Sequence, residues 1–113
     1  MPDRLFLPLN TDRYDMFFNG SKTWEIRGES NRFNIDTVRT GRAVEIRKGY
    51  QKKGALWGKI GRIQITSDIF NLSKWIYDAA IPTSDRQLLN QIRQYNYKYD
   101  KFIVFEVILD ETR

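Results

Sequence analysis

The sequence contains no cysteine and no histidine. Their absence excludes disulfide bonds, thiol nucleophiles, zinc sites of the usual Cys/His kind and catalytic triads built on imidazole. We therefore expect neither a metal nor a cofactor. The sequence also lacks any stretch that approaches the roughly 20 apolar residues of a membrane-spanning helix, and its first residues do not form the apolar run of a signal peptide. These absences predict a soluble, cytoplasmic protein.

The length of 113 residues is that of one compact domain. A chain of this size can bury its own hydrophobic core without a disulfide or a structural metal. The sequence shows no internal repeat, no low-complexity tract and no linker. We therefore expect residues 1–113 to form a single domain.

Positive charge is concentrated in the middle of the chain. The net charge is +5, but between Arg39 and Arg62 eight basic side chains stand against one acidic one, Glu45, which leaves +7 in this segment. Clustered lysine and arginine attract phosphates and release their counterions. A solvated basic hairpin is the alternative, because exposed turns are often rich in lysine. The side chains expected to contact a nucleic-acid backbone are Arg47, Lys48, Lys52, Lys53 and Lys59.

Hydrophobic periodicity predicts an α+β domain with about five to six strands and two or three flanking helices. Strands are expected over residues 5–9, 23–27, 43–48, 56–66 and 102–109. A short helix should have Thr11 as its N-cap and end at Gly20. Helical spacing recurs over residues 69–79 and again after Ser84, and the aromatic residues 95–99 are expected to form a turn.

Two glycines, Gly58 and Gly61, interrupt the long strand expected over residues 56–66. Glycine inside a strand often marks a bulge or the close approach of another backbone, so this strand should curve strongly. We therefore expect a closed or strongly coiled sheet, such as a small barrel, with the apolar strand 102–109 at its centre.

The most informative stretch is residues 20–27, with the sequence GSKTWEIR. In the strand expected here, Trp24 and Ile26 suit the core, and Lys22 lies at the preceding bend. The opposite face of the strand receives Thr23, Glu25 and Arg27. These polar side chains either line a cleft or form an ordinary ion pair on the outer face of the sheet.

This stretch resembles the G-x-K-T-x-E-x-R signature of the ASCH domain family, whose members have a PUA-like β-barrel fold. The surroundings agree, since a strand and a short helix precede the motif, Gly41 marks a turn, and a basic hairpin and an apolar last strand follow. The resemblance implies a cleft that binds RNA or a nucleotide, including a modified one. The residues that it implies for ligand binding are Lys22, Thr23, Glu25 and Arg27. Lys22 and Arg27 would meet phosphate or carbonyl oxygens, and Glu25 would accept from a base amino group.

One branch of this family resembles a small amidohydrolase that removes the acetyl group of N4-acetylcytidine with a lysine, a threonine nucleophile and a glutamate. Lys22 matches the lysine, but Glu25 occupies the position of the threonine, and the later helical region offers only Asp78. Lys22 and Glu25 remain candidates for acid or base catalysis. We therefore expect a binding domain, with the hydrolase as the alternative.

Two further hypotheses concern exposed aromatic residues. The resemblance also implies metal-free ribonuclease activity, for which Lys22 with Tyr50 or Tyr97 would stabilise a cyclic-phosphate transition state. A protein-binding adaptor would instead present Trp57 and Tyr99, because tryptophan and tyrosine are frequent anchors of protein interfaces.

We predict that affinity for a short single-stranded RNA falls steeply as salt rises, because binding releases counterions from the phosphates. Replacing Lys52 and Lys53 by glutamine should reduce the slope of log affinity against log salt concentration by about one to two units. Fluorescence anisotropy with a labelled RNA at several salt concentrations measures this slope. Salt-insensitive binding would contradict the electrostatic interpretation of the basic segment.

Overall fold

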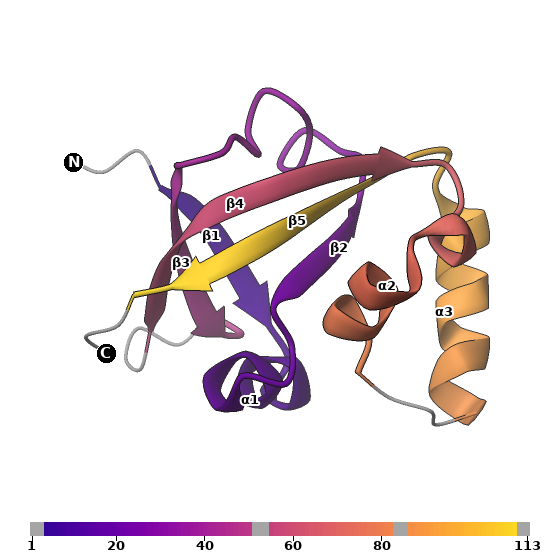
Figure 1. Cartoon of the computed structure of the whole chain (residues 1–113), viewed down its shortest axis with the longest axis horizontal. Coiled ribbons are helices and arrows are strands. Elements are labelled where there is room, and N and C mark those ends of the chain that lie inside the picture. The colour runs from indigo at the N-terminus through magenta and orange to yellow at the C-terminus, as the bar shows by residue number, and fades with distance from the viewer. Residues whose placement is uncertain (1–3, 51–54, 83–85, 111–113) are drawn as a thin grey trace.

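The structure is a computed structural model that describes residues 4–50, 55–82 and 86–110. Within the last range, only the backbone is described for residues 86–88. The chain is α+β, as predicted, and Figure 1 shows its elements. In chain order these are β1 (Leu5–Leu9), α1 (Thr11–Asn19), β2 (Trp24–Gly28), β3 (Ala43–Lys48), β4 (Leu56–Thr66), the 3-10 turn η1 (Ile69–Asn71), α2 (Lys74–Ala80), α3 (Arg86–Lys98) and β5 (Phe102–Leu109).

The five strands form one sheet in the order β1-β3-β4-β5-β2, which curls into a half-barrel (Figure 1). β1 pairs with β3 in parallel, and the other three pairings are antiparallel. β5 lies between β4 and β2, which confirms the central position predicted for the last apolar strand. β1 is an edge strand, where Pro8 is tolerated because its missing N–H is not needed for a second partner.

The bulge predicted in the long strand is present. The register of β4 against β5 shifts between Ile60 and Ile63. A Cβ atom at Gly58 would lie 2.5 Å from the backbone oxygen of Ile108, so this glycine permits the close approach of β5. The sequence prediction of a strongly curved sheet is therefore confirmed, together with its physical cause.

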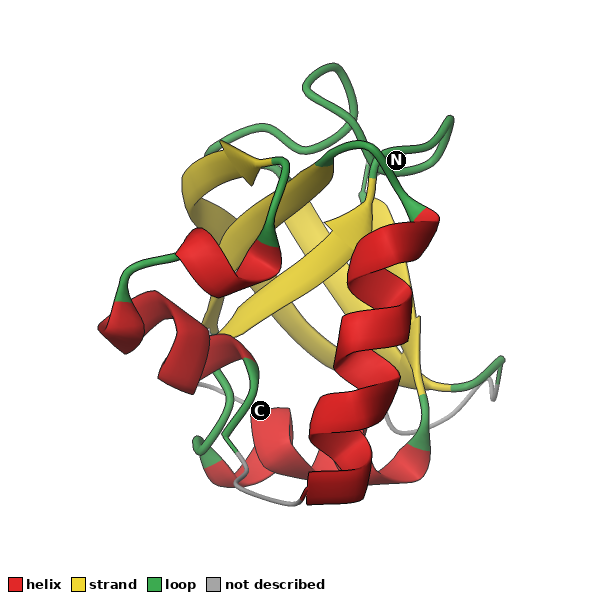
Figure 2. Ribbon diagram, turned by 90° about the vertical axis from the view of Figure 1, so that its right-hand side faces the viewer, coloured by secondary structure: helices red, strands yellow, loops and turns green. Residues whose placement is uncertain are grey.

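Apolar side chains fill both sides of the sheet. The inner cluster joins β1, β3 and β5 to α1 and includes Leu7, Phe17 and Phe105, which are almost fully buried. The second cluster packs the other face of β5 and β2 against α2 and α3, and it includes Trp24 and Val104. Figure 2 shows α2 and α3 lying in front of the sheet. None of the helices in the described part of the chain is long and apolar enough to cross a membrane.

The start of α1 corrects one prediction. Asn10, not Thr11, is its N-cap, because the Asn10 side chain accepts a hydrogen bond from the Arg13 amide at 2.9 Å. Thr11 is the first helical residue. The predicted end is confirmed, since Gly20 has φ 86°, a left-handed conformation that glycine adopts without strain.

The helical region after β4 also differs from the prediction. Residues 69–79 do not form one helix, because the chain is extended at Leu72 and begins again as α2. The amide of Ile69 donates to the side chain of Asn96 on α3, and Asn96 in turn donates to Asp68. These partners lie almost thirty residues away, so local periodicity does not reveal them. The aromatic residues expected in a turn belong mostly to α3, which continues to Lys98.

We predict that Gly58→Ala destabilises the protein by about 2–3 kcal/mol, because the added methyl group collides with the backbone of β5. Gly61→Ala is the matched comparison, since the nearest atom there is Oε1 at the end of the Glu106 side chain. That side chain can move, so Gly61→Ala should cost less. Urea unfolding of both variants tests this, and an equal or smaller loss for Gly58→Ala would contradict it.

Candidate functional site

A cleft of about 780 Å³ opens where the edge strands β1 and β2 meet the helices. Its walls come from segments that are far apart in the sequence: the start of α1, β2, the loop after β2, the end of α2 and the last turns of α3. Lys22, Glu25 and Arg27 all line it. The structure therefore brings together three of the four residues that the ASCH resemblance suggested for ligand binding.

Lys22 lies at the bend between α1 and β2 and is only 4% exposed. Its backbone is held by a hydrogen bond from its amide to the carbonyl oxygen of Met16. The Nζ atom donates to the carbonyl oxygen of Ala80 at the end of α2 and lies 3.3 Å from Oε1 of Glu25. The ring of Phe17 lies below this ammonium group, with its centroid 5.4 Å from Nζ. Lys22 thus links the motif to α2.

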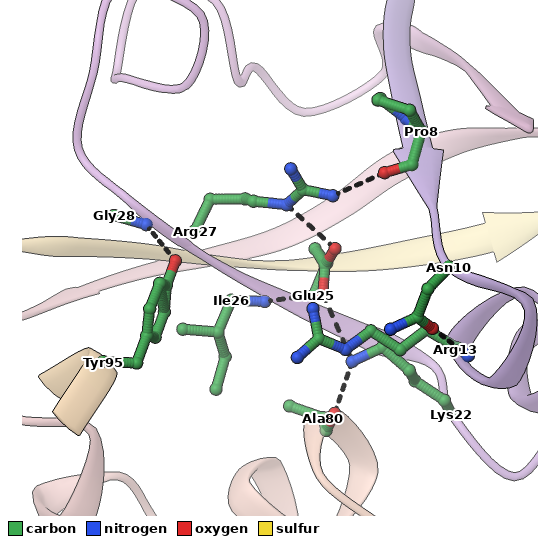
Figure 3. A network of polar contacts seen from close by, with 10 residues as sticks. All are labelled: Pro8, Asn10, Arg13, Lys22, Glu25, Ile26, Arg27, Gly28, Ala80 and Tyr95. Atoms are coloured by element: carbon green, nitrogen blue, oxygen red, sulfur yellow. Dashed lines mark hydrogen bonds and ion pairs between the residues drawn. The ribbon is translucent and has the colours of Figure 1, made fainter. Parts of the chain in front are cut away.

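Glu25 is the central member of the cluster and is only 2% exposed. Its Oε1 accepts from the Ile26 amide at 3.1 Å, and its Oε2 accepts from Nε of Arg27 at 3.0 Å. Figure 3 shows these contacts together with the ion pair to Lys22. A carboxylate with three donors around it holds both neighbouring cations in fixed positions.

Arg27 joins the two edge strands. Its Nη2 donates to the carbonyl oxygen of Pro8 on β1 at 3.0 Å, although β1 and β2 do not pair in the described sheet (Figure 3). The guanidinium also lies over the ring of Phe33, 4.7 Å from its centroid. This side chain therefore spans the open side of the half-barrel where the backbone does not.

The ionisation of the cluster follows from its burial. Burial lowers the pKa of Lys22, and the nearby Glu25 carboxylate offsets only part of that effect. Burial alone would raise the pKa of Glu25, but the charges of Lys22, Arg27 and Arg13 outweigh it and lower the pKa below its usual value of 4.5. Glu25 is therefore an anion, and the cations around it outnumber it.

Aromatic rings form one wall of the cleft. The hydroxyl of Tyr95 accepts a hydrogen bond from the Gly28 amide at 2.7 Å, and burial raises the pKa of Tyr95, which keeps it neutral. Tyr99 packs beside it, with ring centroids 5.2 Å apart. A Cβ atom at Gly28 would lie 2.4 Å from the Tyr99 ring, so the glycine after the motif makes room for this wall. The sequence pattern placed Tyr95 at the end of the second predicted helical stretch and the start of an aromatic turn, and it gave no signal that this residue belongs to the site.

The remaining predictions for the motif have different outcomes. Thr23 is exposed and is not among the described residues that line the cleft. The alternative of an ordinary ion pair on the outer face is wrong, because Glu25 is buried. Asp78 is also exposed and pairs with Lys74 at 2.6 Å, away from the cleft. Arg13 and Arg32, which sequence analysis did not single out, do line it.

The described cations of the basic hairpin lie outside the cleft. Arg47 pairs with Glu45, Lys48 lies 3.6 Å from Asp15, and Lys59 is exposed on β4. Lys52 and Lys53 lie outside the described residues. A nucleic acid that contacted Arg47, Lys48 and Lys59 would therefore touch a surface separate from the cleft.

The aromatic residues named in the other hypotheses are also placed. Tyr50 and Tyr97 are 75% and 89% exposed, and neither lines the cleft that holds Lys22. The structure therefore does not bring together the ribonuclease residues. Trp57 is 40% exposed on β4, whereas Tyr99 belongs to the cleft wall, so these two residues do not form one patch.

Comparison with solved structures identifies the fold. The crystal structure of ASCH from Zymomonas mobilis superposes with a TM-score of 0.66 at 17% identity. The hypothetical protein PH0355 gives a TM-score of 0.68 at 17% identity, with 93% of this chain and 97% of that chain covered. Protein PF0455 from Pyrococcus furiosus gives 0.64 at 13% identity, with 96% and 98% covered. The chain therefore has the ASCH-type fold, as predicted from the motif.

The match to the Zymomonas mobilis protein covers 91% of this chain but only 65% of that protein. No family model and no curated protein matches the chain by sequence. The likeness therefore concerns the fold. The roles of the side chains in the site follow from their own geometry.

We predict that the free energy of unfolding falls as the pH drops below about 4.5, partly because of Glu25. The unfolded chain protonates this carboxyl near 4.5, whereas the folded chain resists protonation, so acid favours unfolding. Glu45 and Glu106, whose pKa values are also lowered, add to the effect. Urea unfolding between about pH 3 and 6 should give a shallower pH dependence for Glu25→Gln than for the unaltered protein. Parallel curves would contradict the ion-pair assignment.

Proposed function

We propose that the cleft binds a nucleotide, either free or as one residue of a single-stranded RNA. The observation that carries this proposal is the ion-pair chain Lys22–Glu25–Arg27, in which Lys22 and Glu25 are buried and Arg27 is half-buried, at the edge of a cleft of about 780 Å³. The cleft has the volume of a small-molecule site. Four cationic side chains and two carboxylates line it, so its charge favours an anionic ligand such as a phosphate ester.

Glu25 serves this site by positioning its neighbours. The Ile26 amide, Lys22 and Arg27 surround its two oxygens, so little of its acceptor capacity is left for a ligand. Lys22 and Arg27 use only some of their N–H groups on protein acceptors. The remaining donors are suited to the phosphate or carbonyl oxygens of the ligand.

The rest of the cleft matches the other parts of a nucleotide. Tyr95, Tyr99 and Phe33 give it apolar aromatic surfaces against which a base can pack. Arg13 and Arg32 are exposed at the rim and can meet the phosphate. The shared fold with ASCH from Zymomonas mobilis supports the assignment, because the motif resemblance implies RNA or nucleotide binding in this same cleft.

Hydrolysis of a modified nucleoside is the second candidate. The lowered pKa of Lys22 favours it, because a lysine acts as a general base only as the neutral amine. Against it, Thr23 does not line the cleft, and Asp78 is paired with Lys74 elsewhere. The hydroxyl of Tyr95 already accepts from Gly28 and belongs to a phenol with a raised pKa, which makes it a poor nucleophile. Binding is therefore the function that the site supports best.

We predict that Lys22→Met weakens binding of cytidine 5′-monophosphate by roughly tenfold to one hundredfold, because a charge-assisted hydrogen bond to the ligand is lost. Glu25→Gln should weaken it less, since it disturbs the donors without removing them. Isothermal titration calorimetry measures both. The control is Glu106→Gln, which alters another carboxylate paired with an arginine but lies outside the cleft.

A variant on the rim separates binding from stability. Arg13 is exposed, so Arg13→Gln should weaken nucleotide binding without changing the melting temperature. Unchanged affinity in both Lys22→Met and Arg13→Gln would contradict the proposal. Incubation of the same proteins with N4-acetylcytidine and with labelled RNA tests catalysis. Release of cytidine or RNA fragments that is lost in Lys22→Met would replace the binding function by a hydrolytic one.

A further inference from the structure

The outer face of the sheet carries a row of three side chains across neighbouring strands. Phe6 on β1 is the register partner of Glu45 on β3, and Glu45 is the partner of Trp57 on β4. Register partners point to the same face of a sheet, so the two aromatic residues flank the carboxylate. The adjacent residues Leu5, Val44 and Leu56 point the other way, into the inner cluster. The row therefore lies on the face opposite the inner core.

Glu45 holds two arginines on this face. Its Oε1 lies 2.6 Å from Nε of Arg4, and its Oε2 pairs with Nε of Arg47. The Glu45 side chain is only 3% exposed, whereas those of Arg4 and Arg47 are 42% and 20% exposed. Burial opposes the charge of Glu45, but the two guanidinium groups outweigh it and lower its pKa. Both guanidinium groups are thus fixed beside the aromatic row and partly open to solvent.

Exposed aromatic rings complete the surface. Tyr50 packs on Phe6 with ring centroids 6.0 Å apart, yet it is 75% exposed. Trp57 is 40% exposed and belongs to neither core cluster. Lys59 follows Trp57 on the same face of β4 and is exposed. Large aromatic rings are thus exposed beside cationic side chains on this face of the described sheet.

We propose that this surface, the aromatic platform formed by Arg4, Phe6, Arg47, Tyr50, Trp57 and Lys59, binds single-stranded nucleic acid. Bases would stack on Trp57 and on the Phe6–Tyr50 pair, and phosphates would meet Arg47 and Lys59. Charge complementarity favours this occupant, because Arg4, Arg47 and Lys59 stand on this face against the single carboxylate of Glu45. The proposal deepens the proposed function and rests on it for the class of ligand, but the platform is physically separate from the cleft.

The geometry favours a single strand over a duplex. Phe6 and Trp57 lie two strands apart, which is about 10 Å. Bases stacked in a duplex are about 3.4 Å apart and have no free faces. Bases that stack on the two aromatic sites must therefore be splayed from one another, as only an unpaired strand allows.

The test compares short oligonucleotides with a mononucleotide. Trp57→Ala should weaken binding of an eight-residue RNA by roughly fivefold to one hundredfold, because one stacked base is lost. The salt slope of that binding should stay the same. Lys59→Gln should instead lower the salt slope by about 0.7, because one phosphate contact is lost. Neither variant should change the affinity for cytidine 5′-monophosphate, which the cleft binds.

Controls make each outcome decisive. Trp75→Ala removes a tryptophan that is also exposed, on α2 rather than on the platform, and should leave RNA affinity unchanged. The Tyr50 side chain is largely exposed, so Tyr50→Ala should leave the protein folded. It should reproduce part of the loss of RNA affinity expected for Trp57→Ala. Single-stranded DNA should bind comparably and duplex RNA more weakly. Unchanged affinity in both Trp57→Ala and Tyr50→Ala, or equal binding of the duplex, would overturn the platform. Oligonucleotide binding without mononucleotide binding would instead overturn the cleft alone.

Discussion

The buried ion-pair chain Lys22–Glu25–Arg27 is the interaction on which the rest of the site depends. Lys22 ties the start of β2 to the end of α2, and Arg27 ties β2 to β1 through Pro8. Removing one partner of such a buried pair leaves an uncompensated charge and typically costs about 3–5 kcal/mol. A buried ion pair is seldom the most stable solution for a core, and its presence at a cleft supports the proposed role in ligand binding.

This arrangement supports the proposed binding function over a catalytic one. The carboxylate at its centre accepts from three donors, while Lys22 and Arg27 also donate to the carbonyl oxygens of Ala80 and Pro8. Each of the two cations has N–H groups beyond these. A hydrolase would also need a nucleophile near Lys22, and Thr23 is exposed outside the cleft. The preorganised donors act without reorganisation when an anionic or carbonyl group arrives, which favours binding.

The sequence predicted what depends on local pattern. Strands β4 and β5 have the predicted bounds, because alternation and apolar density are local signals. The glycines of β4 predicted its bulge. The motif predicted that Lys22, Glu25 and Arg27 lie near one another. It did not predict that Lys22 and Glu25 are buried. The contact of Arg27 with Pro8 joins residues nineteen positions apart, and that of Lys22 with Ala80 joins residues 58 apart. Such partners are set by the closure of the sheet and by helix packing, not by periodicity.

The same limit applies to the outer face and to the helices. The prediction of a single helix over residues 69–79 was wrong. Asn96 on α3 accepts a hydrogen bond from Ile69 and so holds the turn η1 that precedes α2. Charge counting identified the basic segment, but only the strand register shows that Phe6, Glu45 and Trp57 share a row. Composition thus predicts the class of ligand, and topology decides which side chains can act together.

The most direct test of the central claim is an NMR titration of the labelled protein with cytidine 5′-monophosphate. The account predicts that the largest chemical-shift changes occur at Lys22, Glu25 and Arg27 and at the flanking Ala80 and Tyr95, all of which line the cleft. Shifts confined to the β3–β4 hairpin, or no saturable shifts at all, would contradict the claim that the buried ion-pair chain forms a nucleotide-binding site.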